Sequence, residues 1–393
     1  MNEMWSENRY LNLVINILLF LAGINFLHLG QLILPVICFL LFIENRFQFK
    51  VNSPRTFIVL CLFGVSFYAF SHQLGFYSVM GFTLPMAYYI GSNIKDPSEE
   101  KIKKLIYLFA IAMASHVILN AVAELYLHGI HGFFNSSTHY DFWTRDKIAN
   151  TQTAVNADIL IGCIYYLLFH EKNRKWKNFC LIVFVLNMFY LLVIGRRTPV
   201  ILLFLSLILA FIYEAFVLKS VSEKRKRQFF SLLLIGIACI ACVILVYSFD
   251  LFHLRAVLDE THIVHKFKQG LLNDERFRLY FGSFRLMPKY PFGGQKISAE
   301  LGEQIHDLWI DVYDYAGAIT CGLIILYSVL AASVILRVYR NSIFSKDLKT
   351  FCFGVFVCIV TQMFVEPIMT GSSLFMLVTV IVIAVIERRL IHE

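Results

Sequence analysis

The most distinctive chemical signal in the sequence is a histidine followed closely by three aspartates. His306, Asp307, Asp311 and Asp314 lie in the segment GEQIHDLWIDVYDYAGAITCG (302–322), which opens a long apolar stretch. An imidazole titrates near neutral pH and suits a general base, and a neighbouring carboxylate can fix its tautomer and raise its basicity. Acids in an apolar stretch usually face a cavity. We predict His306 as a general base and the three aspartates as substrate-binding residues, although a lone membrane histidine is more often structural.

A pair of adjacent arginines gives a second signal. Arg196 and Arg197 lie in the short turn GRRT between two strongly apolar runs. Guanidinium groups at a membrane surface are costly unless an anion meets them, and their planar five-donor fork suits phosphate. We predict that at least one of them contacts a phosphorylated substrate. The alternative is that they bind lipid headgroups or pair with a carboxylate of the protein.

A third group of chemical residues lies in NDERFRLYFGSFRLMPKYPFGG (273–294). Aromatic residues recur there at three- and four-residue spacing, which predicts a helix over 275–287 lying along the membrane surface. The prolines that follow would end this helix. We predict Arg276 as a catalytic residue and Arg278 and Tyr280 as substrate-binding residues. A helix anchored in lipid headgroups, without chemistry, is the alternative.

The composition indicates that these residues belong to a membrane protein. Of the 393 residues, 58% are hydrophobic and 16% are charged, with a mean hydropathy of +0.67. Soluble domains have about 45–50% apolar and about 25% charged residues. This excludes soluble enzymes, disordered scaffolds and secreted disulfide proteins. The net charge of +8 lies mainly in loops beside apolar runs, so we expect no nucleic-acid partner and a lipid bilayer instead.

Apolar runs of about 20 residues predict membrane-spanning helices. The sequence therefore predicts an all-α polytopic membrane protein, with residues 1–393 forming one domain and residues 249–305 forming its large outer loop. Lys and Arg concentrate in alternate loops, which predicts that both termini are cytoplasmic and that the outer loop is extracytoplasmic. We expect the protein in the cell (inner or plasma) membrane. The twelve predicted spans are 10–28, 31–44, 56–71, 74–92, 103–128, 151–169, 178–195, 199–218, 229–248, 306–336, 350–367 and 371–387.

Taken in order, these motifs resemble the O-antigen ligase and polymerase superfamily. Arg276 precedes an aromatic residue (Tyr280), then Pro-Phe-Gly-Gly (291–294), then His306-Asp307-Leu308 and a span that contains Gly317 and Gly322. The turn GRRTPVILLF (195–204) is similar to the arginine-bearing turn found upstream in that superfamily. The resemblance covers about residues 195–325. It departs at Asp307, where the family usually has asparagine, and at Trp309-Ile310 before Asp311, where the family often has leucine.

The resemblance implies a fold of the GT-C glycosyltransferase type with its active site on the extracytoplasmic face. The donor and acceptor would be oligosaccharides linked to undecaprenyl diphosphate, and the product a surface polysaccharide such as O-antigen or capsule. Arg196, Arg197 and Arg276 would stabilise the diphosphate leaving group, and His306 would deprotonate the acceptor hydroxyl. Transfer would invert the anomeric centre and need no metal or cofactor. A flippase and a chain-length regulator are the other partners that this function implies.

Two alternatives remain open from the sequence. A ligase of the same superfamily would transfer the glycan to another lipid acceptor. A flippase for the lipid-linked sugar belongs to a different class, and transporters commonly show internal repeats and broken helices, neither of which is evident in the sequence.

Overall fold

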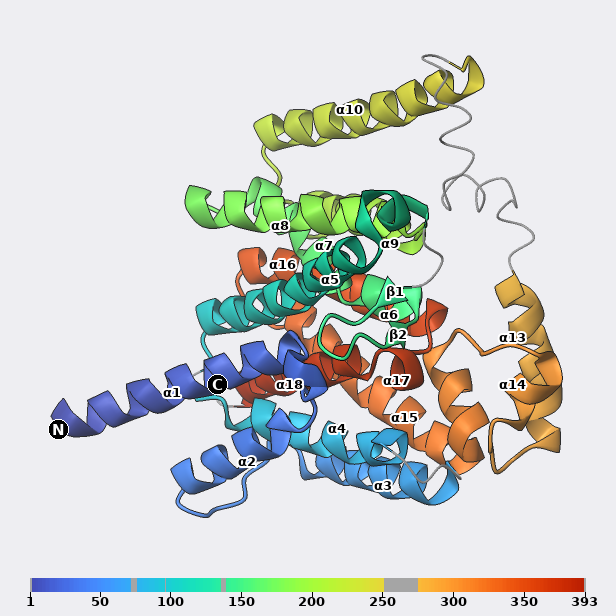
Figure 1. The fold of residues 1–393 in the computed structure, drawn as a ribbon. Coiled ribbons are helices and arrows are strands. Elements are labelled where there is room, and N and C mark those ends of the chain that lie inside the picture. The colour runs from blue at the N-terminus through green and yellow to red at the C-terminus, as the bar shows by residue number, and fades with distance from the viewer. Residues whose placement is uncertain (1, 72–75, 96, 136–138, 251–274, 392–393) are drawn as a thin grey trace. The chain divides into compact units, whose positions relative to one another are not determined.

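A computed structural model describes residues 2–71, 76–95, 97–135, 139–250 and 275–391 (Figure 1). The contacts divide the chain into two compact units, and the single domain expected from the sequence stays a prediction. The first unit comprises Met1–His116, Glu275–Ser345 and Ile359–Glu393, and the second comprises Val117–Asp274 and Lys346–Cys358.

The first unit is a bundle of apolar helices built around its C-terminal helix. Its elements are α1 (Asn2–Gly23), η1 (Phe26–His28), α2 (Ile33–Glu44), α3 (Pro54–Phe70), α4 (Phe76–Asn93), the first turns of α5 (Glu99–Asn135), α13 (Glu275–Leu286), η4 (Met287–Lys289), α14 (Lys296–Leu301), α15 (Leu308–Arg340), the last turns of α16 (Lys346–Val365), α17 (Ile368–Gly371) and α18 (Ser373–Ile391). Helix α4 packs against α3 and α18, and α15 packs against α3. Every residue of α18 from Phe375 to Glu387 is buried. A helix that is apolar on all sides belongs in such a position.

The second unit contains a short antiparallel strand pair and a second group of apolar helices. Its elements are the last turns of α5, β1 (His139–Tyr140), β2 (Lys147–Ile148), α6 (Asn150–Val155), α7 (Asp158–Phe169), α8 (Arg174–Val193), α9 (Thr198–Ile212), the π-helical turn η2 (Tyr213–Val217), α10 (Glu223–Ser248) and the first turns of α16. Helix α7 packs against α8 and α9. One core cluster lies between these helices around Tyr190, Leu191 and Leu202.

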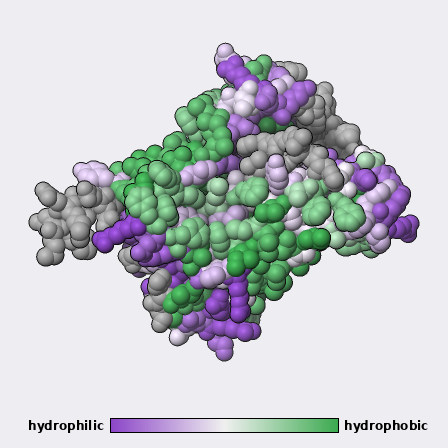
Figure 2. Space-filling model, turned by 90° about the horizontal axis from the view of Figure 1, so that it is seen from below, coloured by the Kyte–Doolittle hydropathy of each residue, from purple (hydrophilic) through white to green (hydrophobic). Residues whose placement is uncertain are grey.

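The helical segments confirm the prediction of an α-helical membrane protein. Among the described residues, six helices are long and apolar enough to cross a bilayer, and three shorter helices are also apolar. Broad areas of the surface are apolar (green in Figure 2). Helical residues cover most of each of the twelve predicted spans. Because six of the described helices meet the length and composition criteria for a membrane span, the presence of twelve spans stays a prediction.

Two polar residues of α5 hold the strand pair and the loop that follows β1. The Glu124 carboxylate accepts a hydrogen bond from the Tyr140 amide at 2.7 Å. The Asn120 side chain accepts one from the Phe142 amide at 3.0 Å. These bonds satisfy loop backbone groups that burial would otherwise leave without partners.

Candidate functional site

The predicted surface helix exists with nearly the predicted limits. Helix α13 spans Glu275–Leu286, against a prediction of 275–287, and Pro288 lies in the 3₁₀ turn that follows. Leu279 is buried, whereas Phe281 and Phe284 are exposed. Exposed aromatic rings on one face agree with a helix that lies along a membrane surface. The side chain of Phe277, which also belongs to the predicted pattern, lies outside the described part of the structure.

The loop after α13 packs against α15 at a break in that helix, and its backbone forms hydrogen bonds there. Gly317 has φ 77° and ψ −174°, so α15 is interrupted there. The loop that carries Pro291 and Gly293 docks on the break through backbone groups. The Ala318 amide donates to the Pro291 carbonyl at 2.8 Å, and the Gly294 amide donates to the Tyr315 carbonyl at 3.1 Å. The backbone groups freed by the break therefore find partners within the protein, as a membrane requires.

The side chain of Tyr280 links α13 to the two segments that carry the other site residues. Its hydroxyl lies 2.7 Å from the His306 carbonyl and 2.6 Å from the Phe364 carbonyl. The ring also packs on a small core that contains Ile305 and Ile310. Tyr280 thus holds the backbone of His306 in place, and the substrate-binding role that the sequence predicts for it stays a prediction.

Glu366 brings Arg276 and His306 to one carboxylate. Arg276 Nη2 lies 3.2 Å from Glu366 Oε1, and His306 Nδ1 lies 3.4 Å from Glu366 Oε2. The Glu366 side chain is 2% exposed, against 26% for Arg276 and 31% for His306. The guanidinium of Arg276 donates a hydrogen bond to this buried carboxylate and so compensates part of the cost of burying its charge. The Nδ1 edge of the His306 ring is thus the edge that faces Glu366.

The three predicted aspartates act as structural acceptors in the fold. Asp307 is the N-cap of α15 and accepts from the Trp309 and Ile310 amides, each at 2.9 Å. Such caps satisfy amides that have no partner within the helix. Asp311 accepts from the Thr370 hydroxyl at 2.8 Å.

Asp314 caps another helix in a similar way. It accepts from the Ile297 amide at 2.9 Å and from the Ser298 hydroxyl, at the start of α14. The acid that faces the His306 ring is thus Glu366. The helix begins at Leu308 and not at residue 306 as the sequence predicts, so His306 lies before α15.

Burial raises the pKa of Asp307 to about 6, although its two backbone hydrogen bonds act in the opposite direction. Below its ordinary pKa near 3.8 the carboxyl is neutral in both folded and unfolded chains. As the pH rises through 6, the folded protein must hold a buried charge that the unfolded chain exposes to water. The stability that this group contributes is therefore complete at low pH and lost across this window.

We predict that Asp307→Asn, which keeps an N-cap but cannot ionise, gains stability over the wild type as the pH rises from 4 to 7. The gain should reach about 2–3 kcal/mol. Thermal unfolding of both proteins across this range measures it. Asp146→Asn, at an exposed acid, is the matched control and should show no such trend. If the difference in unfolding free energy between the wild type and Asp307→Asn stays constant with pH, the predicted effect of burial on Asp307 is wrong.

The remaining predicted arginines are Arg278 in the first unit and Arg196 and Arg197 in the second. Arg278 lies on the exposed side of α13, 3.7 Å from Glu303. Arg196 and Arg197 occupy the predicted turn between α8 and α9, where Gly195 has φ 71° and Arg197 precedes the first residue of α9. Both belong to the second unit, so their contribution to the site stays a prediction.

Neither a protein-family model nor a curated protein matches the chain. The arrangement of the side chains must therefore support a function by itself.

Glu366 is a site residue that the sequence motifs do not single out. An acid directly before a proline at the end of an apolar span is a signal for it, because buried acids in membranes are often functional. Its partners cannot be read from the sequence, since Arg276 lies 90 residues away.

Proposed function

We propose that the protein is a membrane glycosyltransferase that polymerises oligosaccharide repeat units linked to undecaprenyl diphosphate. The observation that carries the proposal is the Arg276–Glu366–His306 cluster. It joins the two residues that the sequence predicts as catalytic, from segments far apart in the chain. The order of motifs over about residues 195–325 supports the same superfamily, with a GT-C-type fold, twelve spans and an extracytoplasmic site.

The cluster supplies the two groups that such a transfer needs. His306 accepts the proton of the acceptor hydroxyl on the nitrogen that points away from Glu366, and the Glu366 carboxylate stabilises the resulting imidazolium. The acceptor oxygen forms a bond to the anomeric carbon as the bond from that carbon to the diphosphate oxygen breaks. The diphosphate leaves with the electron pair, and Arg276 stabilises its charge. A single displacement of this kind inverts the anomeric centre.

The break in α15 gives little support to the flippase alternative. Transporters use broken helices to direct free helix ends at a substrate. Here the backbone at Gly317 is occupied by the loop that contains Pro291. The interruption therefore serves to attach the outer loop.

An assay with purified protein and one lipid-linked repeat unit, without added divalent metal, tests the proposal. A ladder of longer glycans would support a polymerase. Transfer of one glycan to a different lipid acceptor would indicate a ligase. Movement of the lipid-linked sugar across vesicles with no new glycosidic bond would indicate a flippase and contradict the enzyme.

We predict that Glu366→Gln lowers kcat by about 10²-fold with little change in donor binding. A neutral amide can still accept a hydrogen bond but cannot stabilise the imidazolium. Turnover and donor binding of the purified variant measure the two effects separately.

Glu387→Gln is the matched control, because Glu387 is also a buried acid of the first unit and lies near Arg337. It should leave kcat unchanged. An equal fall in kcat for both variants would show that Glu366 acts only through the stability of the fold.

A further inference from the structure

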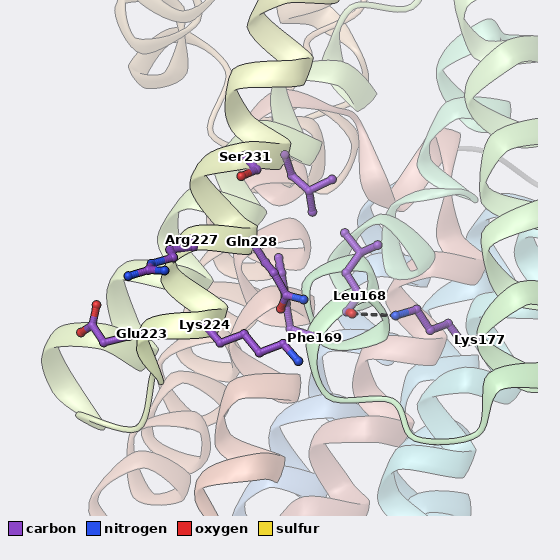
Figure 3. Close-up of a pocket in the computed structure, with 9 residues that line it drawn as sticks. Leu168, Phe169, Lys177, Glu223, Lys224, Arg227, Gln228 and Ser231 are labelled. Atoms are coloured by element: carbon purple, nitrogen blue, oxygen red, sulfur yellow. Dashed lines mark hydrogen bonds between the residues drawn. The ribbon is translucent and has the colours of Figure 1, made fainter.

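A pocket in the second unit lies far along the chain from the cluster around Glu366. It has a volume of about 740 Å³ and lies between the end of α7, the start of α8 and the first turns of α10. Figure 3 shows Lys224 and Gln228 extending from α10 toward Phe169 of α7. Lys177 of α8 donates to the Leu168 carbonyl at 2.7 Å on the opposite wall.

The lining of this pocket changes from basic to apolar. Its basic part contains Lys177, Lys224 and Arg227, and its apolar part contains Leu168, Phe169 and Leu232. Such a lining matches an amphiphile that carries a negative headgroup and a hydrocarbon chain.

The basic part of the lining contains three cations against one acid. The one acid in the lining, Glu223, forms an ion pair with Lys226 at 2.7 Å. Within the part of the chain that the structure describes, Lys224 and Arg227 form no ion pair within 4.0 Å. An external anion can therefore meet these two cations.

The wall formed by α10 is fixed by contacts on its other face. Arg225 forms an ion pair with Glu214, a carboxylate that is 1% exposed and also accepts from the Tyr165 hydroxyl at 2.8 Å. One turn later, the Phe229 ring stacks on Phe211 with centroids 4.0 Å apart. These contacts hold the first turns of α10 against α7 and α9, so the pocket is part of the fold.

The pocket also lies where a lipid would reach it. The first turn of α10 is strongly basic, and Leu234, Ile235 and Ile237 further along the helix are exposed apolar residues. A boundary between basic and apolar surface on one helix is typical of the edge of a bilayer. A lipid headgroup would lie at the boundary between the basic and apolar surfaces of α10, and its acyl chain would lie beside Leu232.

We propose that this pocket binds an anionic phospholipid, with its phosphate at Lys224 and an acyl chain along Leu168, Phe169 and Leu232. Arg227, which Figure 3 shows directed away from Lys224, adds positive charge at the edge of the pocket. The site is separate from the proposed transfer reaction and does not depend on it. Soluble phosphate could meet the same cations, but it would leave the apolar part of the pocket empty.

Native mass spectrometry of the full chain in detergent, titrated with phosphatidylglycerol, tests the proposal. Lys224→Gln/Arg227→Gln should weaken binding on the order of 30-fold, because each cation near an anionic lipid contributes a factor of about five. The matched control is Lys172→Gln/Lys175→Gln, which removes two exposed cations beside the pocket that do not line it. It should bind as the wild type does.

A second variant tests the apolar part. Leu232→Ser should weaken phosphatidylglycerol binding while the thermal unfolding temperature stays unchanged, because Leu232 is 44% exposed. Equal losses in both double variants, or no loss in either, would overturn the proposal. So would equal binding of phosphatidylcholine, or displacement of the lipid by an equal concentration of inorganic phosphate or pyrophosphate.

Discussion

Replacing His306 with alanine should reduce turnover by about 10²- to 10⁴-fold, the range over which a positioned general base contributes to catalysis. In the proposed reaction, the imidazole beside Glu366 is the group that takes the acceptor proton. Donor binding should persist, because Arg276 keeps its contact with Glu366. Turnover of a lipid-linked repeat unit, with donor binding measured in parallel, gives the result. His306→Gln should also fail, since an amide can contact Glu366 but cannot take up the proton.

His128 offers a matched control for this experiment. Its side chain is 32% exposed and lies 3.8 Å from the buried Glu124, whereas His306 is 31% exposed and lies 3.4 Å from Glu366. The two histidines therefore have similar exposure and a similar acidic neighbour. His128→Ala should retain turnover. Retained turnover in His306→Ala would remove the general-base assignment, and so would an equal loss in both variants.

Replacing Gly317 with alanine should lower stability by about 2–6 kcal/mol. At φ 77° and ψ −174°, Gly317 has a backbone conformation that is essentially confined to glycine, and a side chain there costs about 1–3 kcal/mol. A Cβ at this position would also lie 2.5 Å from the Pro291 carbonyl oxygen. Relief of that overlap requires the loop to move, at a further cost of about 1–3 kcal/mol. Thermal unfolding in detergent measures the loss.

Gly322, on the same helix, is the matched control. A Cβ at Gly322 meets no other atom within 4 Å, so Gly322→Ala should be neutral or slightly stabilising. Gly293→Ala should behave like Gly317→Ala, because Gly293 has φ 72° and its Cβ would lie 2.6 Å from the Gly317 amide. Unfolding temperatures for Gly317→Ala and Gly322→Ala that agree within a degree would contradict the proposed docking.

The sequence predicts local structure well where one short segment contains the signal. The aromatic spacing that starts near Arg276 predicts α13 to within one residue, and the turn that contains Arg196 lies between two helices as expected. Apolar runs likewise mark the positions of the membrane helices, because length and composition alone identify them.

The site itself could be predicted only in part, because its contacts join distant segments. His306 and Arg276 are evident as chemical residues, but the acid between them is Glu366 and none of the three aspartates near His306. Asp307 illustrates the reason. An acid just before an apolar helix can be an N-cap or a substrate-binding residue, and its position in the sequence is the same in both cases. The break at Gly317 also depends on a partner loop that the helical pattern does not reveal.

The sealed interruption of α15 has a consequence for how the protein is made. Before the loop around Pro291 docks, the peptide groups beside Gly317 have no partners and strongly disfavour entry into lipid. The stretch from Leu308 to Gly317 can therefore settle into the bilayer only together with the loop that precedes it. Insertion of this part of the chain is thus a concerted event, in which the loop around Pro291 and the start of α15 enter their final positions together.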